Sequence, residues 1–190
     1  MYLLEKKILE EGKVIGTEIL KVDSFLNHQI DVALANEMGK DIFAHFKDKK
    51  VTKILTVEAS GIGLACIVAQ YFNCKVVFAK KSKTRQLTED LYESKVHSFT
   101  HGDDNIIRVS KKYLGADDTV LILDDFLAMG EAVHGMMDIV NQAGAKLAGV
   151  AIAIEKGFQG GGDNLRAQGI DLYSLAIVDS MSENGIQFRK

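Results

Sequence analysis

The segment TVLIL, residues 119–123, carries Val, Leu and Ile side chains on both faces of a strand, and this limits the folds open to the chain. A strand that buries both faces lies in the middle of a sheet that helices cover on either side. The runs KILTV (53–57) and KVVFA (75–79) have strand composition and flank a helical pattern at 62–72. The alternation predicts βαβ units, and so an α/β fold with a central, mostly parallel sheet.

The remaining segments are assigned by their periodicity. Apolar residues at helical spacing predict a helix over 2–11 and another after Asp31, which has the residue type of an N-cap. Residues 14–31 have no clear period, and 80–93 are polar and basic. We expect 95–99 and 106–110 to pair as an antiparallel excursion. Around the acidic segment described below, we expect a helix at 132–143 and a buried strand at 147–154.

The chain length and the net charge limit the functions that this protein can have. With 190 residues, we expect one domain with a continuous core. Lys and Arg total 23 against 26 Asp and Glu, and this net charge of −3 would repel a nucleic-acid backbone over most of the surface. No apolar run approaches the roughly 20 residues of a membrane span, and the N-terminus lacks the pattern of a signal peptide. We therefore expect a cytoplasmic protein that binds neither nucleic acid nor membrane.

The two cysteines, Cys66 and Cys74, have no metal-ligand spacing. They lie in a predicted helix and a predicted strand. We expect both to be buried, reduced thiols.

The strongest chemical signal is VLILDDFLAMGEA, residues 120–132. Asp124 and Asp125 follow the buried strand, and a short loop containing Gly130 then leads into a helix. The first N–H groups of a helix have no partner within the helix and favour an anion. Gly130 lets the backbone approach that anion closely. Because the carboxylates cannot bind a phosphate, they must face something else, such as hydroxyls, and a phosphorylated sugar satisfies both halves of the motif.

Three predicted strand ends converge on this rim of the sheet. Glu58, Asp124 and Lys156 each lie at or just beyond the carboxyl end of a predicted strand, where ligands of open α/β sheets bind. Two solvated carboxylates beside an ordinary turn are the alternative interpretation. The buried strand before the acids and the glycine turn after them favour a site.

The segment 120–132 resembles the phosphoribosyl-pyrophosphate (PRPP) loop of type I phosphoribosyltransferases. The likeness extends over nearly the whole chain, through ILKVDSFLNHQID (19–31), EASGIG (58–63) and GVAIAIEKGFQGG (149–161), and it is most specific to the bacterial xanthine phosphoribosyltransferase family. It implies the type I phosphoribosyltransferase fold, with a single domain over 1–190. A small hood over the active site would be formed by about 1–31 and about 155–190.

The resemblance also implies roles for individual residues. Asp124 and Asp125 would hold the ribose hydroxyls, since ionised carboxylates accept hydrogen bonds. Pyrophosphate would be neutralised by a basic cluster of Lys80, Lys81, Lys83 and Arg85, within which Lys81 is the preferred catalytic residue because it lies nearest the strand end. The other PRPP contacts would come from Ala128, Met129, Gly130, Glu131 and Ala132 at the 5′-phosphate, and from Glu58, Ala59, Ser60 and Gly61 at the pyrophosphate.

The purine base would be bound by Leu20, Asn27 and Lys156. The lysine ammonium suits a dioxopurine because it donates to a carbonyl oxygen, while Leu20 offers an apolar face and Asn27 a donor and an acceptor. Phe158 would either stack near the base or pack within the hood. Mg²⁺ would arrive with PRPP, and we predict no dedicated protein ligand set for it.

Three positions depart from the family pattern. Met129 stands where the family usually has Thr or Asn, so a hydrogen bond worth on the order of 1–3 kcal/mol to the phosphate is lost. Glu131 brings a carboxylate to the phosphate turn, which is repulsive unless it points outward. Leu64 replaces a proline of the pyrophosphate loop. Ala128 stands where hypoxanthine-guanine enzymes carry an acid, which favours xanthine or adenine as the base.

The resemblance therefore implies a purine salvage enzyme, homodimeric in the family pattern, that converts xanthine and PRPP to xanthosine 5′-monophosphate (XMP) and pyrophosphate. Two alternatives remain open. One is a PRPP-binding transcription regulator on the same fold, although such regulators carry an additional basic N-terminal domain and only about 50 residues precede the first predicted core strand here. The other is a phosphoribosyltransferase for adenine or other purines.

Overall fold

The computed structural model describes residues 1–81, 90–97 and 104–190. A six-stranded sheet lies at its centre, in the order β10-β9-β8-β7-β3-β4. Neighbouring strands are parallel except β10, which runs antiparallel to β9. The strands are β3 (Lys53–Val57), β4 (Lys75–Ala79), β7 (Thr119–Leu127), β8 (Lys146–Lys156), β9 (Leu172–Ser182) and β10 (Gly185–Phe188). The helices are α1 (Tyr2–Glu11), α2 (Val32–Phe46), α3 (Gly61–Phe72), α4 (Glu131–Gln142) and α5 (Gly161–Ala167).

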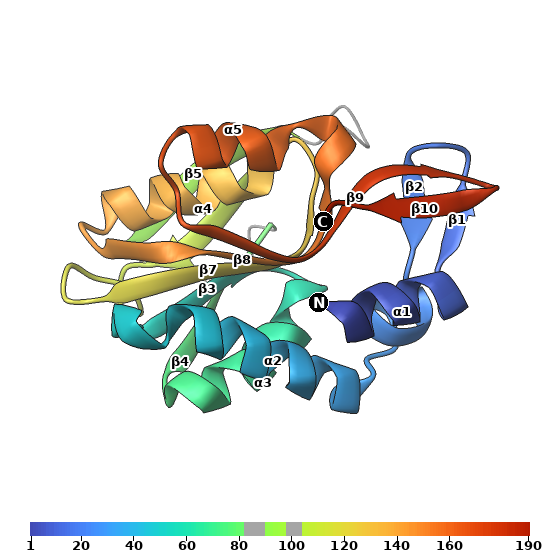
Figure 1. The fold of residues 1–190 in the computed structure, drawn as a ribbon. Helices are drawn as coiled ribbons and strands as arrows, with labels where there is room; N and C mark the ends of the chain where they lie inside the picture. The colour runs from blue at the N-terminus through green and yellow to red at the C-terminus, as the bar shows by residue number, and fades with distance from the viewer. Residues whose placement is uncertain (82–89, 98–103) are drawn as a thin grey trace.

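Helices cover both faces of the sheet, as the apolar strand at 119–123 predicts (Figure 1). Leu121 and Leu123 of β7 pack into the core cluster under α2 and α3, whereas Val120 and Ile122 pack into the cluster under α4. All four side chains are fully buried. Burial stabilises the fold by about 1.5–3 kcal/mol for each such side chain. The strand that ends in the two acids is therefore one of the most firmly held parts of the molecule.

Two smaller sheets complete the fold. The hairpin β1 (Lys13–Ile15) and β2 (Ile19–Lys21) is followed by a π-helical turn, η1 (Asp23–Asn27). The hairpin β5 (Leu91–His97) and β6 (Asp104–Ser110) packs beside α4. In Figure 1, α1, β1 and β2 gather with β10 at one end of the molecule. Two short 3-10 turns, η2 (Lys47–Lys49) and η3 (Gly157–Gln159), follow α2 and β8.

Most predicted elements are confirmed within a residue or two. The predicted strands 53–57 and 75–79 and the helix 2–11 have the observed bounds, and the helices predicted at 62–72 and 132–143 each begin one residue earlier. The N-cap prediction is also confirmed, since the Asp31 carboxylate accepts a hydrogen bond from the Leu34 N–H at 3.0 Å.

The predicted bounds of two strands need correction. The strand expected to end at residue 123 continues to Leu127, so Asp124 and Asp125 lie within β7 rather than after it. The strand expected at 95–99 begins at Leu91 and so takes up the end of the predicted loop 80–93; Ser98 and Phe99 lie outside the described residues.

Cys66 is exposed rather than buried, and Cys74 is half-buried. Helix α3 turns Leu64, Ala65 and Val68 into the core, and residue 66 falls outside that stripe. Burial raises the pKa of the Cys74 thiol. Among the described residues, no helix combines the length and the apolar character that crossing a bilayer requires.

Candidate active site

A cavity of about 600 Å³ opens at the carboxyl ends of β3, β7 and β8, where the predicted strand ends were expected to meet. Its lining includes Glu58 just after β3, Asp124 within the second half of β7, and Lys156 at the end of β8. The turn between β1 and β2 also reaches the cavity, through Glu18 and Ile19. The parallel sheet therefore brings residues that are distant in the sequence to one rim.

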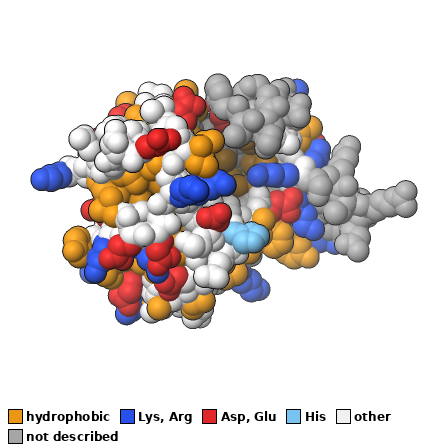
Figure 2. Space-filling view, turned by 90° about the vertical axis from the view of Figure 1, so that its right-hand side faces the viewer, with side chains coloured by type: hydrophobic (Ala, Val, Ile, Leu, Met, Phe, Trp, Pro, Cys, Tyr) orange, Lys and Arg blue, Asp and Glu red, His pale blue; other side chains and the backbone are white. Residues whose placement is uncertain are grey.

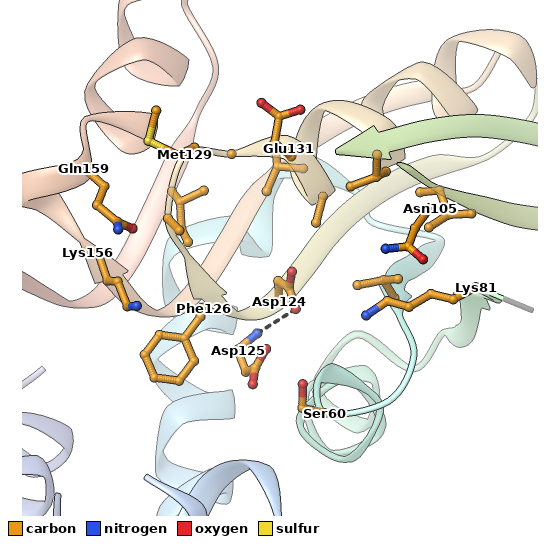
Figure 3. Close-up of a pocket in the computed structure, with 18 of the residues that line it drawn as sticks. Ser60, Lys81, Asn105, Asp124, Asp125, Phe126, Met129, Glu131, Lys156 and Gln159 are labelled. Atoms are coloured by element: carbon orange, nitrogen blue, oxygen red, sulfur yellow. Dashed lines mark hydrogen bonds between the residues drawn. The ribbon is translucent and has the colours of Figure 1, made fainter. Parts of the chain in front are cut away.

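The two acids lie on the floor of this cavity (Figure 3). Asp124 is 6% exposed and Asp125 is 7% exposed, and the backbone N–H of Asp125 donates to Asp124 Oδ1 at 2.9 Å. Burial and, second, the charge of Asp125 raise the pKa of Asp124 well above its usual value, while Lys81 acts weakly in the opposite direction. The pair forms a concentrated set of hydrogen-bond acceptors that faces into the cavity.

The N-terminus of α4 forms the adjacent wall. Gly130 takes φ 97°, the left-handed conformation that favours glycine, and so turns the chain from β7 into the helix. The first N–H groups of the twelve-residue helix have no acceptor within the helix. Ala128, Met129, Gly130, Glu131 and Ala132 all line the cavity. Backbone donors at one side and the twin acids at the other therefore face the same space.

Helix α5 packs closely against the loop that precedes α4. An added Cβ at Gly161 would overlap the carbonyl oxygen of Ala128 and lie 2.6 Å from the carbonyl carbon of Met129. Only a residue without a side chain allows α5 to approach the loop so closely. Gly161 carries no signal of its own in the sequence, because the tight contact joins residue 161 to residues 128 and 129, which are distant along the chain.

The segment Glu58–Gly61 approaches the cavity from the end of β3. Glu58 and Ser60 line the cavity, whereas Ala59 and Gly61 do not. The peptide bond between Glu58 and Ala59 is cis. Glu58 accepts a hydrogen bond from the Lys81 N–H at 2.5 Å and donates its own N–H to the Ala79 carbonyl at 3.0 Å. This carboxylate therefore fixes the start of the chain segment that follows β4.

Lys81 and Ser60 lie on the same side of the cavity, and the side chain of Lys81 is exposed (Figure 3). Lys80 pairs through its backbone with Arg108 of β6 in a single antiparallel bridge. The other predicted members of the basic cluster, Lys83 and Arg85, lie outside the described residues. Of the predicted cluster, Lys81 alone is placed at the cavity by the part of the chain that the structure describes.

The far end of the cavity contains Lys156. Its Nζ donates to the Glu18 carbonyl oxygen at 2.7 Å and lies 5.8 Å from the ring centre of Phe126. Burial lowers the pKa of Lys156, and the charge of Glu18 opposes that shift. A half-buried ammonium group beside an aromatic ring and Gln159 suits a planar ligand that carries carbonyl acceptors.

The other two predicted base-binding residues do not line the cavity. Leu20 is 6% exposed and belongs to the core under α1 and α2. Its neighbour Ile19, 51% exposed, lines the cavity instead, because successive residues of β2 face opposite sides. Asn27 is exposed at the end of η1.

The three departures from the family pattern are placed differently. Met129 is 41% exposed at the cavity edge. The carboxylate of Glu131 points away from Asp124 and Asp125 in Figure 3. Leu64 is 2% exposed in the core beneath α3 and does not line the cavity. Glu131 thus has the outward orientation that avoids direct repulsion at the phosphate turn.

Several lining residues were not predicted. Val96, Asn105 and Ile107 come from the β5–β6 hairpin, Phe126 stands between predicted site residues, and Gln159 follows the last of them, Lys156. Phe126 and Gln159 had a detectable signal, since each is close in sequence to a predicted ligand. The hairpin residues had none, because only tertiary packing on α4 brings them to the rim.

Among the described residues, no group of three or more His, Cys, Asp or Glu side chains is arranged to hold a metal ion. Asp124 and Asp125 are the carboxylates at the cavity floor. Two carboxylates suit Mg²⁺ that is held mainly by substrate phosphates and water. On the face shown in Figure 2, basic and acidic side chains are interspersed, so this face presents mixed charge.

Comparison with known proteins identifies consistent relatives. A family model described as "Phosphoribosyl transferase domain" matches residues 21–165. A xanthine phosphoribosyltransferase from Ruminiclostridium cellulolyticum is 60% identical over 188 residues, 99% of each chain. One from Clostridioides difficile is 54% identical over 190 residues, the whole of both chains.

Solved structures show the same fold. The adenine phosphoribosyltransferase of Giardia lamblia complexed with 9-deazaadenine superimposes with a TM-score of 0.77 at 23% identity, covering 92% of this chain and 96% of the other. The Saccharomyces cerevisiae adenine phosphoribosyltransferase gives a TM-score of 0.74 at 18% identity, covering 92% and 99%. At these identities the likeness concerns the fold alone.

Proposed function

The chain belongs to the phosphoribosyltransferase family, and from this premise we propose that it is a purine salvage enzyme that converts xanthine and PRPP to XMP and pyrophosphate. The observation that best supports this proposal is that two buried acids, the N-terminus of α4 and Lys156 surround one cavity. Relatives named xanthine phosphoribosyltransferase that match the whole chain at 54–60% identity support xanthine as the base.

PRPP is oriented by complementary groups in this proposal. The 5′-phosphate lies against the backbone N–H groups at the start of α4, where the helix dipole favours negative charge. Asp124 and Asp125 accept hydrogen bonds from the ribose hydroxyls. Glu58, Ala59, Ser60 and Gly61 present backbone to the pyrophosphate, and Lys81 faces it from the same side. Mg²⁺ bound to the diphosphate supplies further neutralisation of the leaving group.

The reaction replaces the bond between the sugar carbon and pyrophosphate by a bond to a purine nitrogen, which gives up its proton. The transition state has cation-like character at the sugar carbon, so the protein contributes alignment and stabilisation of the leaving group rather than a nucleophile. Lys156 donates to a carbonyl oxygen of the base, and Phe126 offers it an apolar surface. In the N-terminal segment, Ile19 lines the cavity and offers a further apolar surface, whereas Leu20 and Asn27, the residues expected from the family resemblance, do not line it.

The proposal extends to the organisation of the protein. Residues 1–190 form a single phosphoribosyltransferase domain in which about 1–31 and about 155–190 make a hood. The hydrogen bond from Lys156 to the Glu18 carbonyl supports this division, because it joins the two segments above the cavity. A cytoplasmic homodimer that binds neither nucleic acid nor membrane agrees with the family resemblance.

A nucleotide-forming assay tests the proposal. The protein is incubated with PRPP and Mg²⁺ against xanthine, hypoxanthine, guanine and adenine, and nucleotide products are separated by chromatography. We expect XMP to form fastest. Turnover of adenine without turnover of xanthine would instead identify an adenine enzyme, and PRPP binding without turnover of any purine would identify a regulator.

A further inference from the structure

One buried polar atom in the cavity has no partner within the protein. Gln159 Oε1 is inaccessible to solvent and makes no hydrogen bond among the described residues. A second such atom, Thr56 Oγ1, lies behind Gly61, and Thr56 does not line the cavity. Buried side-chain oxygens are rarely left unsatisfied, and a lost partner costs about 1–3 kcal/mol. Because Gln159 lines the cavity, rotation of its terminal amide brings this unpaired oxygen to a ligand bound there.

Local backbone geometry places Gln159 beside Lys156. The chain leaves β8 at Lys156 and forms the 3-10 turn η3, which has three residues per turn, so residue 159 lies above residue 156. Both side chains line the cavity at its far end from Lys81 (Figure 3). A donor, Lys156 Nζ, and an acceptor, Gln159 Oε1, are thus presented next to each other, with the Phe126 ring close to the lysine.

We propose that Gln159 is a specificity-determining residue that accepts a hydrogen bond from the purine N1–H, next to the 6-carbonyl bound by Lys156. This inference rests on the proposed function and deepens it. In xanthine, the C6 carbonyl is an acceptor and the adjacent N1–H is a donor, which matches the lysine and the glutamine in order. Adenine reverses the pattern, since its C6 amino group donates and its N1 accepts. Gln159 therefore selects 6-oxopurines against adenine.

Charge supports this assignment. Lys156 is half-buried and already donates to the Glu18 carbonyl, and its ammonium group has only donors, so its remaining N–H groups favour a carbonyl acceptor over the amino group of adenine. If adenine were bound, its N1 and the Gln159 oxygen would be two acceptors facing each other without a donor, and such a mismatch at a buried site lowers affinity. The two residues thus discriminate through the same edge of the base.

Gln159→Leu tests the proposal, because it keeps the volume and removes the acceptor. We expect kcat/KM for xanthine to fall 10- to 100-fold, mainly through KM, with KM for PRPP within twofold of wild type. The preference for xanthine over adenine, measured as a ratio of kcat/KM values in competition, should narrow at least tenfold. Gln159→Glu retains an oxygen acceptor and should keep most of that preference.

Gln168→Leu is the matched control, because the same change is made on an exposed residue outside the cavity. The inference is wrong if Gln159→Leu matches this control, or if it lowers kcat/KM for xanthine and adenine by the same factor. Failure of wild-type protein to form XMP would overturn the proposed function itself. An active wild type with an unaltered Gln159→Leu variant would overturn only the role of Gln159. Should Gln159→Leu not fold, loss of the xanthine preference in Gln159→Glu would be the contrary result.

Discussion

Asp124 is a residue whose ionisation opposes folding. Its carboxyl is buried on the cavity floor beside Asp125, and both the burial and the neighbouring charge raise its pKa. The folded protein therefore holds a proton at pH values where the unfolded chain has released it, so stability falls as pH rises above the ordinary Asp pKa of about 4. Each unit by which folding raises this pKa removes about 1.4 kcal/mol of stability at neutral pH.

Asp124→Asn should accordingly raise the free energy of unfolding at pH 7.5 while it lowers turnover by at least tenfold. The amide oxygen can still accept the hydrogen bond from the Asp125 N–H. Urea denaturation over pH 4 to 8 measures the effect, and the difference between variant and wild type should grow with pH. A difference that is constant across this range, or a less stable variant at pH 7.5, would contradict the argument.

Met129 is the residue at which the phosphate turn departs from the family pattern. Its exposed side chain contributes no donor, so only backbone N–H groups face the proposed phosphate. Met129→Thr should tighten PRPP binding by about 1 kcal/mol, or about fivefold, since the introduced hydroxyl adds one charge-assisted bond at a partly solvated position. Calorimetry with PRPP and Mg²⁺ provides the measurement. Unchanged or weaker affinity would refute this account.

Single residues also mark the limit of sequence analysis. Asp124, Asp125 and Lys156 could be predicted because they follow apolar strands whose ends must meet. The choice between Ile19 and Leu20 could not, because residues 14–31 show no period that assigns one face of β2 to the core. Gln159 was passed over because the absence of a partner becomes visible only once the surrounding atoms are placed.

At the scale of elements, the contact between α5 and the phosphate turn joins stability to function. Gly161→Ala would force the Ala128–Met129 backbone away from α5, because the added methyl group has no space there. We expect KM for PRPP to rise at least tenfold, together with a loss of stability of about 1–3 kcal/mol. Gly115→Ala is the control, because its added methyl group has no neighbour within 4 Å. Equal kinetics for the two variants would show that the contact does not support the turn.

The elements that could be predicted are those with a strong local pattern. The strand 53–57 and helix 2–11 were defined by their own residues, whereas β7 was predicted four residues too short because charged Asp124 and Asp125 resemble a strand end. The last three elements of the fold, α5, β9 and β10, were not assigned. Residues 160–171 combine four glycines with polar residues, and the helix there depends on packing against β8 and β9.

At the scale of the whole molecule, the cavity joins the central sheet to the N-terminal hairpin. The phosphate turn and the acids belong to β7 and α4, while Glu18 and Ile19 come from the β1–β2 turn. A ligand that occupies only the phosphate-binding part of the cavity contacts only the central sheet and α4. It can therefore suppress local opening only in those elements. A ligand that also carries the base contacts Lys156, which bonds the hairpin through Glu18, and so should protect both parts from local opening.

Hydrogen exchange can separate these two effects. Ribose 5-phosphate should slow exchange at the start of α4 but leave residues 13–21 unchanged, whereas XMP should slow exchange in both segments by at least threefold. Both ligands are used at saturating concentration, so a difference in affinity cannot explain a difference in protection. The exchange rates then report which local openings the bound state suppresses. Equal protection of 13–21 by both ligands would mean that the hairpin responds to the phosphate alone, and the base would then have to bind elsewhere than between Lys156 and Phe126.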